Sequence, residues 1–143
     1  MTRHIFNICS AFILIASFSF AQSQNTEFGV WKLMNQKNGI EIYGKHDLCL
    51  IEPAPNDYHF LSVKVVNTNT TEKEISFYIK NFYQEGESGH RDENLTMITL
   101  EANETIEGSC MDENATLTRM IVNPQFVDSW HYIKSEIIFE SIK

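Results

Sequence analysis

The chain has 143 residues, 43% of them hydrophobic and 21% charged, which is enough for one domain with a sizeable core. Its 19 acidic residues outnumber its 11 lysines and arginines, giving a formal net charge of -8. Such a surface repels nucleic acid and anionic lipid, and no basic cluster offsets it, so we expect neither as a partner.

The N-terminal segment predicts export. Arg3 precedes a mostly apolar run over 11–20, and the tripeptide that ends at Ala21 fits the small-x-small cleavage pattern. The apolar run is shorter than the roughly 20 residues that a membrane-spanning helix needs, so we expect no membrane span after cleavage. The predicted parts are a signal peptide over 1–21, a polar leader over 22–27 and a single domain over 28–143. The expected location is the periplasm, the cell envelope or the medium.

Two cysteines remain after cleavage, Cys49 and Cys110. In an exported protein an even pair predicts a disulfide. Closing a loop of about 60 residues would stabilise the fold by up to roughly 4 kcal/mol in the chain-entropy model. Two separately buried thiols are the alternative, and neither cysteine lies in a nucleophile signature.

Beyond the leader, the chain consists of short β-type runs separated by turn residues. The run over 58–67 places Leu61, Val63 and Val65 on one face, the period of a strand with a buried side. The run over 75–83 alternates in the same way, and the polar turn between the two predicts an antiparallel hairpin near the centre of a sheet. The other runs cover 28–34, 40–45, 47–52, 95–100, 105–110, 115–122 and 132–142.

These short strands, with almost no helical periodicity, predict an all-β protein. We expect an antiparallel immunoglobulin-like or fibronectin-like β-sandwich of about 7–9 strands. The standard immunoglobulin core is not expected, because Trp31 and Trp130 both lie outside the interval between the two cysteines. The polar segment over 84–94 is predicted to be a loop.

The longest motifs are W-K-L-x4-N-G-I-E-I-Y over 31–43, L-S-V-K-V-V-N-T-N over 61–69 and L-E-A-N-E-T-I-E-G-S-C over 100–110. Together with the signal peptide and the terminal β-run, they resemble small exported bacterial β-sandwich proteins of unassigned function. The resemblance implies the same fold over nearly the whole mature chain and carries no active site. The first motif alone also resembles the start of START-type lipid-binding domains, which close their cavity with a long C-terminal helix where this chain has a predicted strand.

Four aromatic residues are the candidate binding surface. Tyr43, Tyr78, Phe82 and Tyr83 would form one patch if Tyr78 lies on the outer face of its strand. The alternative is that they fill the core or cover a sheet edge.

Catalytic and metal-binding patterns are missing from the sequence. It contains no nucleophile elbow and no histidine pair at zinc spacing; His46, three residues before Cys49, comes nearest. We therefore expect no enzyme and no cofactor.

The motif Asp-Glu-Asn-x-Thr occurs twice, over 92–96 and 112–116. If the two loops met, Asp92, Asn94, Asp112 and Asn114 would supply oxygen ligands for calcium, although neither stretch has the spacing of a self-contained calcium loop. Both asparagines also begin glycosylation sequons. We interpret both copies as turns that open a strand, because Asp and Asn bond their own backbone.

These observations predict an exported partner-binding or structural module of the cell envelope. The alternative is a carrier of a small, lipid-like ligand, and a third is a calcium-dependent adhesion-type module. An enclosed apolar cavity would favour the carrier, whereas a filled core with a flat aromatic face would favour the binding module.

Overall fold

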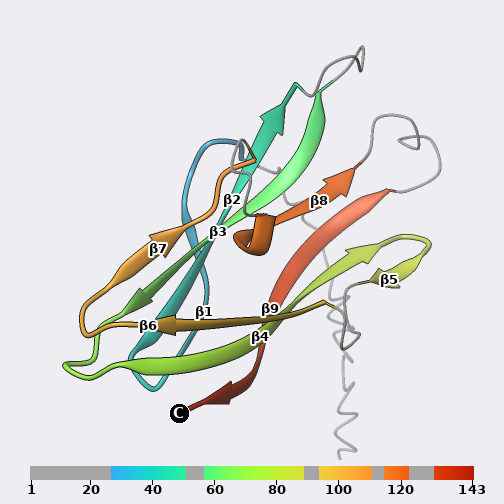
Figure 1. Ribbon diagram of the computed structural model, residues 1–143. Helices are drawn as coiled ribbons and strands as arrows, with labels where there is room; N and C mark the ends of the chain where they lie inside the picture. The colour runs from blue at the N-terminus through green and yellow to red at the C-terminus, as the bar shows by residue number, and fades with distance from the viewer. Residues whose placement is uncertain (1–26, 51–56, 89–93, 111–114, 123–130) are drawn as a thin grey trace, which may run out of the picture.

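The computed structural model describes residues 27–50, 57–88, 94–110, 115–122 and 131–143. Within these residues, nine strands form two antiparallel sheets packed as a sandwich (Figure 1). The prediction of an all-β sandwich is confirmed. The predicted signal peptide lies outside the described residues.

The first sheet contains five strands and the second contains four. The first runs from β1 (Lys32–Lys37) through β2 (Ile40–Cys49) to β3 (Tyr58–Asn67), whose other edge pairs with β7 (Thr105–Glu107) and β8 (Thr118–Val122). In the second, β4 (Lys73–Tyr83) has β5 (Gly86–Ser88) and β6 (Leu95–Leu100) along one edge and β9 (Tyr132–Ile142) along the other.

The core lies between the sheets and is filled by alternate residues of the long strands. Leu61, Val63 and Val65 of β3 are fully buried, as their alternation predicts. Ile75 and Phe77 of β4 meet them from the opposite sheet and are fully buried as well. Each such side chain contributes about 1.5–3 kcal/mol through burial, so these strands determine most of the sandwich's stability.

The predicted hairpin between the runs over 58–67 and 75–83 is wrong. Strand β3 pairs with β2, β7 and β8, whereas β4 pairs with β5, β6 and β9, so the chain passes from one sheet to the other after Asn67. Both strands alternate because both line the core. Alternation identifies the buried face of a strand and not its hydrogen-bonded neighbour.

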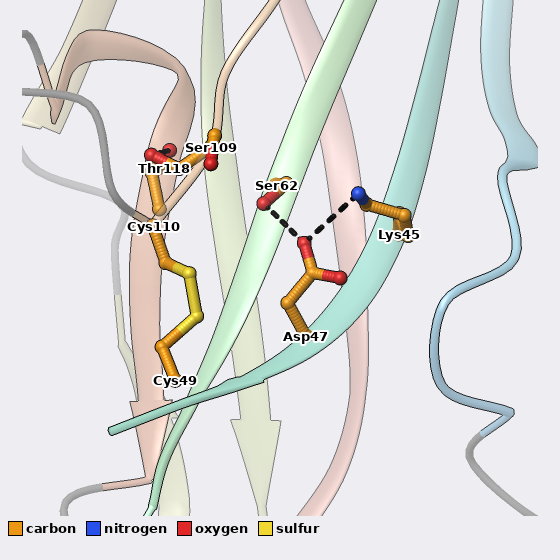
Figure 2. The surroundings of a disulfide bond; sticks show 7 residues. All are labelled: Lys45, Asp47, Cys49, Ser62, Ser109, Cys110 and Thr118. Atoms are coloured by element: carbon orange, nitrogen blue, oxygen red, sulfur yellow. Dashed lines mark hydrogen bonds and ion pairs between the residues drawn. A yellow bond between two sulfur atoms is a disulfide. The ribbon is translucent and has the colours of Figure 1, made fainter.

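Some strand boundaries also differ from the prediction. Residues 40–49 form the single strand β2, which joins the run expected over 40–45 to the start of the run expected over 47–52, and β5 lies inside the segment expected to be a loop. Polar residues do not interrupt β2, because Asp47 accepts a hydrogen bond from Ser62 Oγ at 2.7 Å and pairs with Lys45 Nζ at 3.3 Å (Figure 2).

Candidate functional site

The two sheets leave a groove where their edge strands meet. Among the described strands, β1 pairs only with β2 and β9 only with β4, so each is the edge of its sheet. The groove between them has a volume of about 670 Å³. Its lining comes from residues 32–35 of β1 and 132–137 of β9, with Gly44, His46 and Leu61 beneath them on neighbouring strands.

Asn35 ties the two edges together. The register of β1 shifts between Leu33 and Asn35, and Asn35 Nδ2 then donates to the Ile137 carbonyl oxygen at 2.7 Å. That carbonyl therefore points away from β4. Because backbone groups alternate in direction along an antiparallel strand, the amide and carbonyl of Ser135 point the same way. Strand β9 thus presents backbone hydrogen-bonding groups to the groove.

Gly44 makes room for Met34 at the apolar base of the groove. A Cβ on Gly44 would overlap the thioether sulfur of Met34 and come within 3.0 Å of Leu61 Cδ1. Met34 is partly buried and packs against the core. A larger residue at position 44 would push β1 outward and reshape the groove.

A histidine cluster, made of His46, His59, Phe28 and Tyr132, lies beside the groove. His46 Nδ1 and His59 Nε2 are 2.9 Å apart and share a hydrogen bond, so one ring donates and the other accepts. Phe28 packs 5.1 Å from the His59 ring, and Tyr132 packs 5.6 Å and 5.5 Å from the His46 and His59 rings. Imidazole rings that are packed among aromatic side chains and partly removed from water favour the uncharged form.

The pKa values of this cluster follow from burial. Burial, with nearby Lys32, lowers the pKa of His46, and burial, with His46 itself, lowers the pKa of His59 to about 4. Burial also raises the pKa of the Tyr132 hydroxyl to about 12. All three rings are therefore uncharged at neutral pH, and the cluster forms an uncharged aromatic wall.

The Tyr132 hydroxyl is fixed by a chain of hydrogen bonds. Ser135 Oγ donates to Asn81 Oδ1 at 2.7 Å, so its lone pair accepts from the Tyr132 hydroxyl at 3.0 Å. This orients the ring against the histidines. The Tyr132 ring is therefore held in one orientation at the side of the groove.

The rim of the groove combines balanced charges with exposed apolar side chains. Lys32 pairs with Glu27 at 3.0 Å, and Lys134 pairs with Glu136 at 2.5 Å. Ile133 of β9 and Leu33 of β1 are 48% and 49% exposed. The rim therefore presents apolar side chains, paired charges and the backbone groups of β9.

The predicted disulfide between Cys49 and Cys110 is confirmed. It joins the last residue of β2 to the segment that leads to β8, with the two Cα atoms 6.4 Å apart (Figure 2). Next to it, Thr118 Oγ1 donates to the Ser109 carbonyl oxygen at 3.1 Å. Since the two cysteines are in the first sheet and its connecting segment, the bond crosslinks that sheet and does not touch the groove.

The four predicted aromatic residues do not form one patch. Tyr43 belongs to β2 in the first sheet, whereas Tyr78, Phe82 and Tyr83 belong to β4 in the second. Tyr83 is part of the core, and its hydroxyl donates to the Ile121 carbonyl oxygen at 2.7 Å. A single patch would need all four side chains on one surface. Phe82 and Tyr83 do not share a surface, because consecutive residues of a strand point to opposite faces.

Tyr43 instead takes part in a cation–π group on the first sheet. Lys64 Nζ lies 4.7 Å from the Trp31 ring and 4.9 Å from the Tyr43 ring. The Tyr43 hydroxyl donates to Glu41 Oε2 at 2.6 Å, and that carboxylate raises the pKa of Tyr43. The Lys64 ammonium is therefore paired with the two aromatic rings, and the Tyr43 hydroxyl is paired with the Glu41 carboxylate.

Of the predicted calcium ligands, the structure describes only Asn94, whose carbonyl oxygen accepts from Arg119 Nη2 at 3.2 Å. Asp92, Asp112 and Asn114 lie outside the described residues. In the part of the chain that the structure describes, no three His, Cys, Asp or Glu side chains gather closely enough to hold a metal ion. The same part contains no helix with the length and apolarity to cross a membrane.

The histidine cluster was missed at the sequence level because its two histidines are 13 residues apart. A signal for it exists in the alternation of β2 and β3. His46 has the parity of the buried Ile40 and Ile42, and His59 has the parity of the buried Leu61. This parity predicts that both histidine side chains point toward the space between the sheets.

Comparison with known proteins gives one structural likeness. No family model matches the chain, and no curated protein matches its sequence. A solved structure of a DUF1425 family member from Shewanella sp. pv-4 is 8% identical, with a TM-score of 0.43, over 79% of this chain and 96% of that chain.

Proposed function

We infer that this protein is an exported binding module that takes up an extended polypeptide segment as an added strand along β9. The observation that carries the proposal is the groove of about 670 Å³, along which the edge of β9 has no paired strand among the described residues other than β4 on its far side. Main-chain hydrogen bonds to an edge strand supply affinity in this mode of recognition, and side-chain pockets supply specificity. The disulfide and the N-terminal sequence support a periplasmic, envelope or extracellular location.

The lining of the groove suits such a segment. An added strand places alternate side chains on the two faces of the sheet. One face would meet Leu33, Met34 and the aromatic wall of Tyr132, and the other would meet Lys134 and Glu136. The immunoglobulin-like or fibronectin-like subtype, and a bacterial envelope as the setting, belong to this proposal too.

A small-ligand carrier ranks lower. Carriers enclose an apolar cavity, whereas the described inner faces of β3 and β4 pack directly against each other in a continuous core. The groove is open along one side of the sandwich and half polar in its rim, which suits a polypeptide better than a lipid tail. The calcium-dependent adhesion module ranks third, because neither Asp-Glu-Asn stretch has the spacing of a self-contained calcium loop.

The test is selection of peptides and their titration against groove variants. Random peptides of about ten residues displayed on phage would be selected on the chain that begins at Gln22, and the selected peptides titrated by fluorescence anisotropy. Ile133→Asp should weaken binding about tenfold or more, because it places a charge at an exposed apolar position of the groove.

The matched control is Met97→Asp, which adds the same charge at a 69% exposed apolar position on β6, on the opposite edge of β4. It should leave binding unchanged. Equal affinity of the selected peptides for Ile133→Asp and for the unaltered chain would show that the groove is not the binding site.

A further inference from the structure

The central part of β9 is complementary to itself. Residues 133–137 read Ile-Lys-Ser-Glu-Ile, so the order of residue types is the same in both directions except that Lys134 and Glu136 exchange sign. In an antiparallel pairing of two copies centred on Ser135, each Lys134 stands opposite the other copy's Glu136. Ile133 lies just outside this pairing, because β9 bulges there: Lys134 pairs with Phe82 and Tyr132 with Tyr83. Opposite charges directly across a strand pair attract, and like charges there repel.

The geometry of the edge agrees with this register. The carbonyl of Ile137 points away from β4, and the backbone groups of Ser135 share that direction, so Ser135 is placed to exchange two hydrogen bonds with its counterpart. The Ile137 carbonyl already accepts from Asn35 at 2.7 Å, but a carbonyl oxygen has a second lone pair. The ladder would end there, because β1 approaches the edge at that point.

The charges on the outer face of β9 are already ordered for such a contact. Lys134 Nζ lies 4.8 Å from the Phe82 ring and 2.5 Å from Glu136 Oε1, and Glu136 stands opposite Lys80 in the register. A second copy would bring its Lys134 to the free side of Glu136.

We propose that the strand received in the groove is β9 of a second copy, so that two chains form a two-fold dimer centred on Ser135, with residues 134–136 of each chain paired. This inference rests on the proposed function and names its partner. The paired segment is short, because β9 bulges at Ile133 and β1 approaches at Ile137, so the dimer should dissociate in the micromolar range.

The test is sedimentation velocity of the chain that begins at Gln22, from about 5 to about 500 µM, with charge-reversed variants. The unaltered chain should shift from monomer to dimer over this range. Lys134→Glu and Glu136→Lys should each weaken dimerisation about tenfold to thirtyfold, because each places two like-charge pairs across the two-fold axis.

Two combinations should restore the dimer. The double variant K134E/E136K recovers both opposite-charge pairs within one chain, and an equimolar mixture of the two single variants recovers them as a heterodimer. Lys143→Glu, which breaks the ion pair with Glu74 at 3.0 Å, controls for the change in net charge and should dimerise like the unaltered chain.

A chain that stays monomeric at 500 µM, or single variants that dimerise normally, would overturn the self-pairing, as would a mixture that fails to associate. Peptide binding that is still sensitive to Ile133→Asp would in that case leave the groove's proposed function standing. Loss of both would remove the function and the inference together.

Discussion

At one end of the sandwich three turns are hydrogen-bonded to one another and to the buried side chain of Asn67, whereas toward the opposite end the described contacts are between aromatic rings, imidazoles and a disulfide. Asn67, the last residue of β3, is fully buried and donates through Nδ2 to the carbonyl oxygens of Thr71 and Glu101 at 2.9 and 2.8 Å. Its Oδ1 accepts from the backbone amide of Asn69 at 3.0 Å. Since Glu101 follows β6, this side chain bonds the two sheets directly.

The turn between β1 and β2 completes that end. Asn38 and Gly39 have φ values of 50° and 73°, which is the geometry of a two-residue hairpin turn and the reason for the Asn-Gly pair. The Gly39 carbonyl oxygen accepts from the Thr68 amide at 2.8 Å, and the Asn69 carbonyl oxygen accepts from the Asn103 amide at 3.1 Å. Three turns are therefore bonded to one another.

The histidine end is organised by different chemistry. The His46–His59 pair and Tyr132 pack as rings, and the Cys49–Cys110 bond lies at the same end of β2. Hydrogen-bonded turns respond little to pH or redox state, whereas imidazoles and a disulfide respond to both. The groove borders the responsive end, so a change in pH or redox state would act on the protein where the proposed partner binds.

The largest effect should come from the disulfide. Cys49→Ser with Cys110→Ser opens a loop with a sequence separation of 61, and the chain-entropy model gives a loss of up to about 4 kcal/mol in the free energy of unfolding. Urea unfolding at neutral pH measures it, with the unaltered chain under reductant as a second reading. A loss below about 1 kcal/mol in the free energy of unfolding would mean that the disulfide contributes little to the stability of the histidine end.

A smaller loss is expected from Asn67→Ala, about 3 kcal/mol, because buried carbonyl groups lose their donors. The matched variant is Asn81→Ala on the groove side, a buried asparagine that accepts from Ser135 at 2.7 Å, for which we expect about 1 kcal/mol. Both are measured by urea unfolding in the oxidised protein. Equal losses would contradict the view that Asn67 joins the sheets.

The smallest effect is the pH dependence at the histidine end. The pKa of His59 is about 4 in the folded chain and about 6.5 when unfolded, so the unfolded chain binds the proton first as pH falls. Stability should be constant above pH 6.5 and fall between pH 6.5 and 4, by about 1–2 kcal/mol after screening by solvent at the partly exposed ring.

His59→Gln should reduce the slope of the unfolding free energy over this window, as measured by urea titrations at a series of pH values; the slope that remains belongs to His46, whose pKa burial also lowers. Asn67→Ala should shift the whole curve down without changing its slope, because that variant acts at the other end. A slope that His59→Gln leaves unchanged would place the titrating group elsewhere.

Much of the fold was predictable from local pattern. The bounds of β3, β6 and β9 match the predicted runs. These bounds depend on period-two alternation and on flanking turn residues, and both are local features of each segment. The disulfide followed from the number of cysteines and the expected compartment. By contrast, the partner of each strand was not predictable, as the wrong hairpin between β3 and β4 shows.

The candidate site was not predictable from the same signals. Its walls come from β1 and β9, at opposite ends of the chain, and the shift of register that aims Asn35 at Ile137 has no marker in the residue types. The prediction grouped four residues because all are aromatic: Tyr43, Tyr78, Phe82 and Tyr83. The structure places Tyr43 in the first sheet and the other three in the second.

Alternation along the sequence identifies which residues face the core, because this property depends on neighbours two positions apart. It predicted the number of strands only as about 7–9, since it divided β2 into two runs and left β5 in a loop. The sequence also contains the self-complementary order of residues 133–137. Only the tertiary structure decided that β9 is an edge and that His46 meets His59. Contacts between distant strands depend on how two twisted sheets stack, and that information is spread over the whole chain.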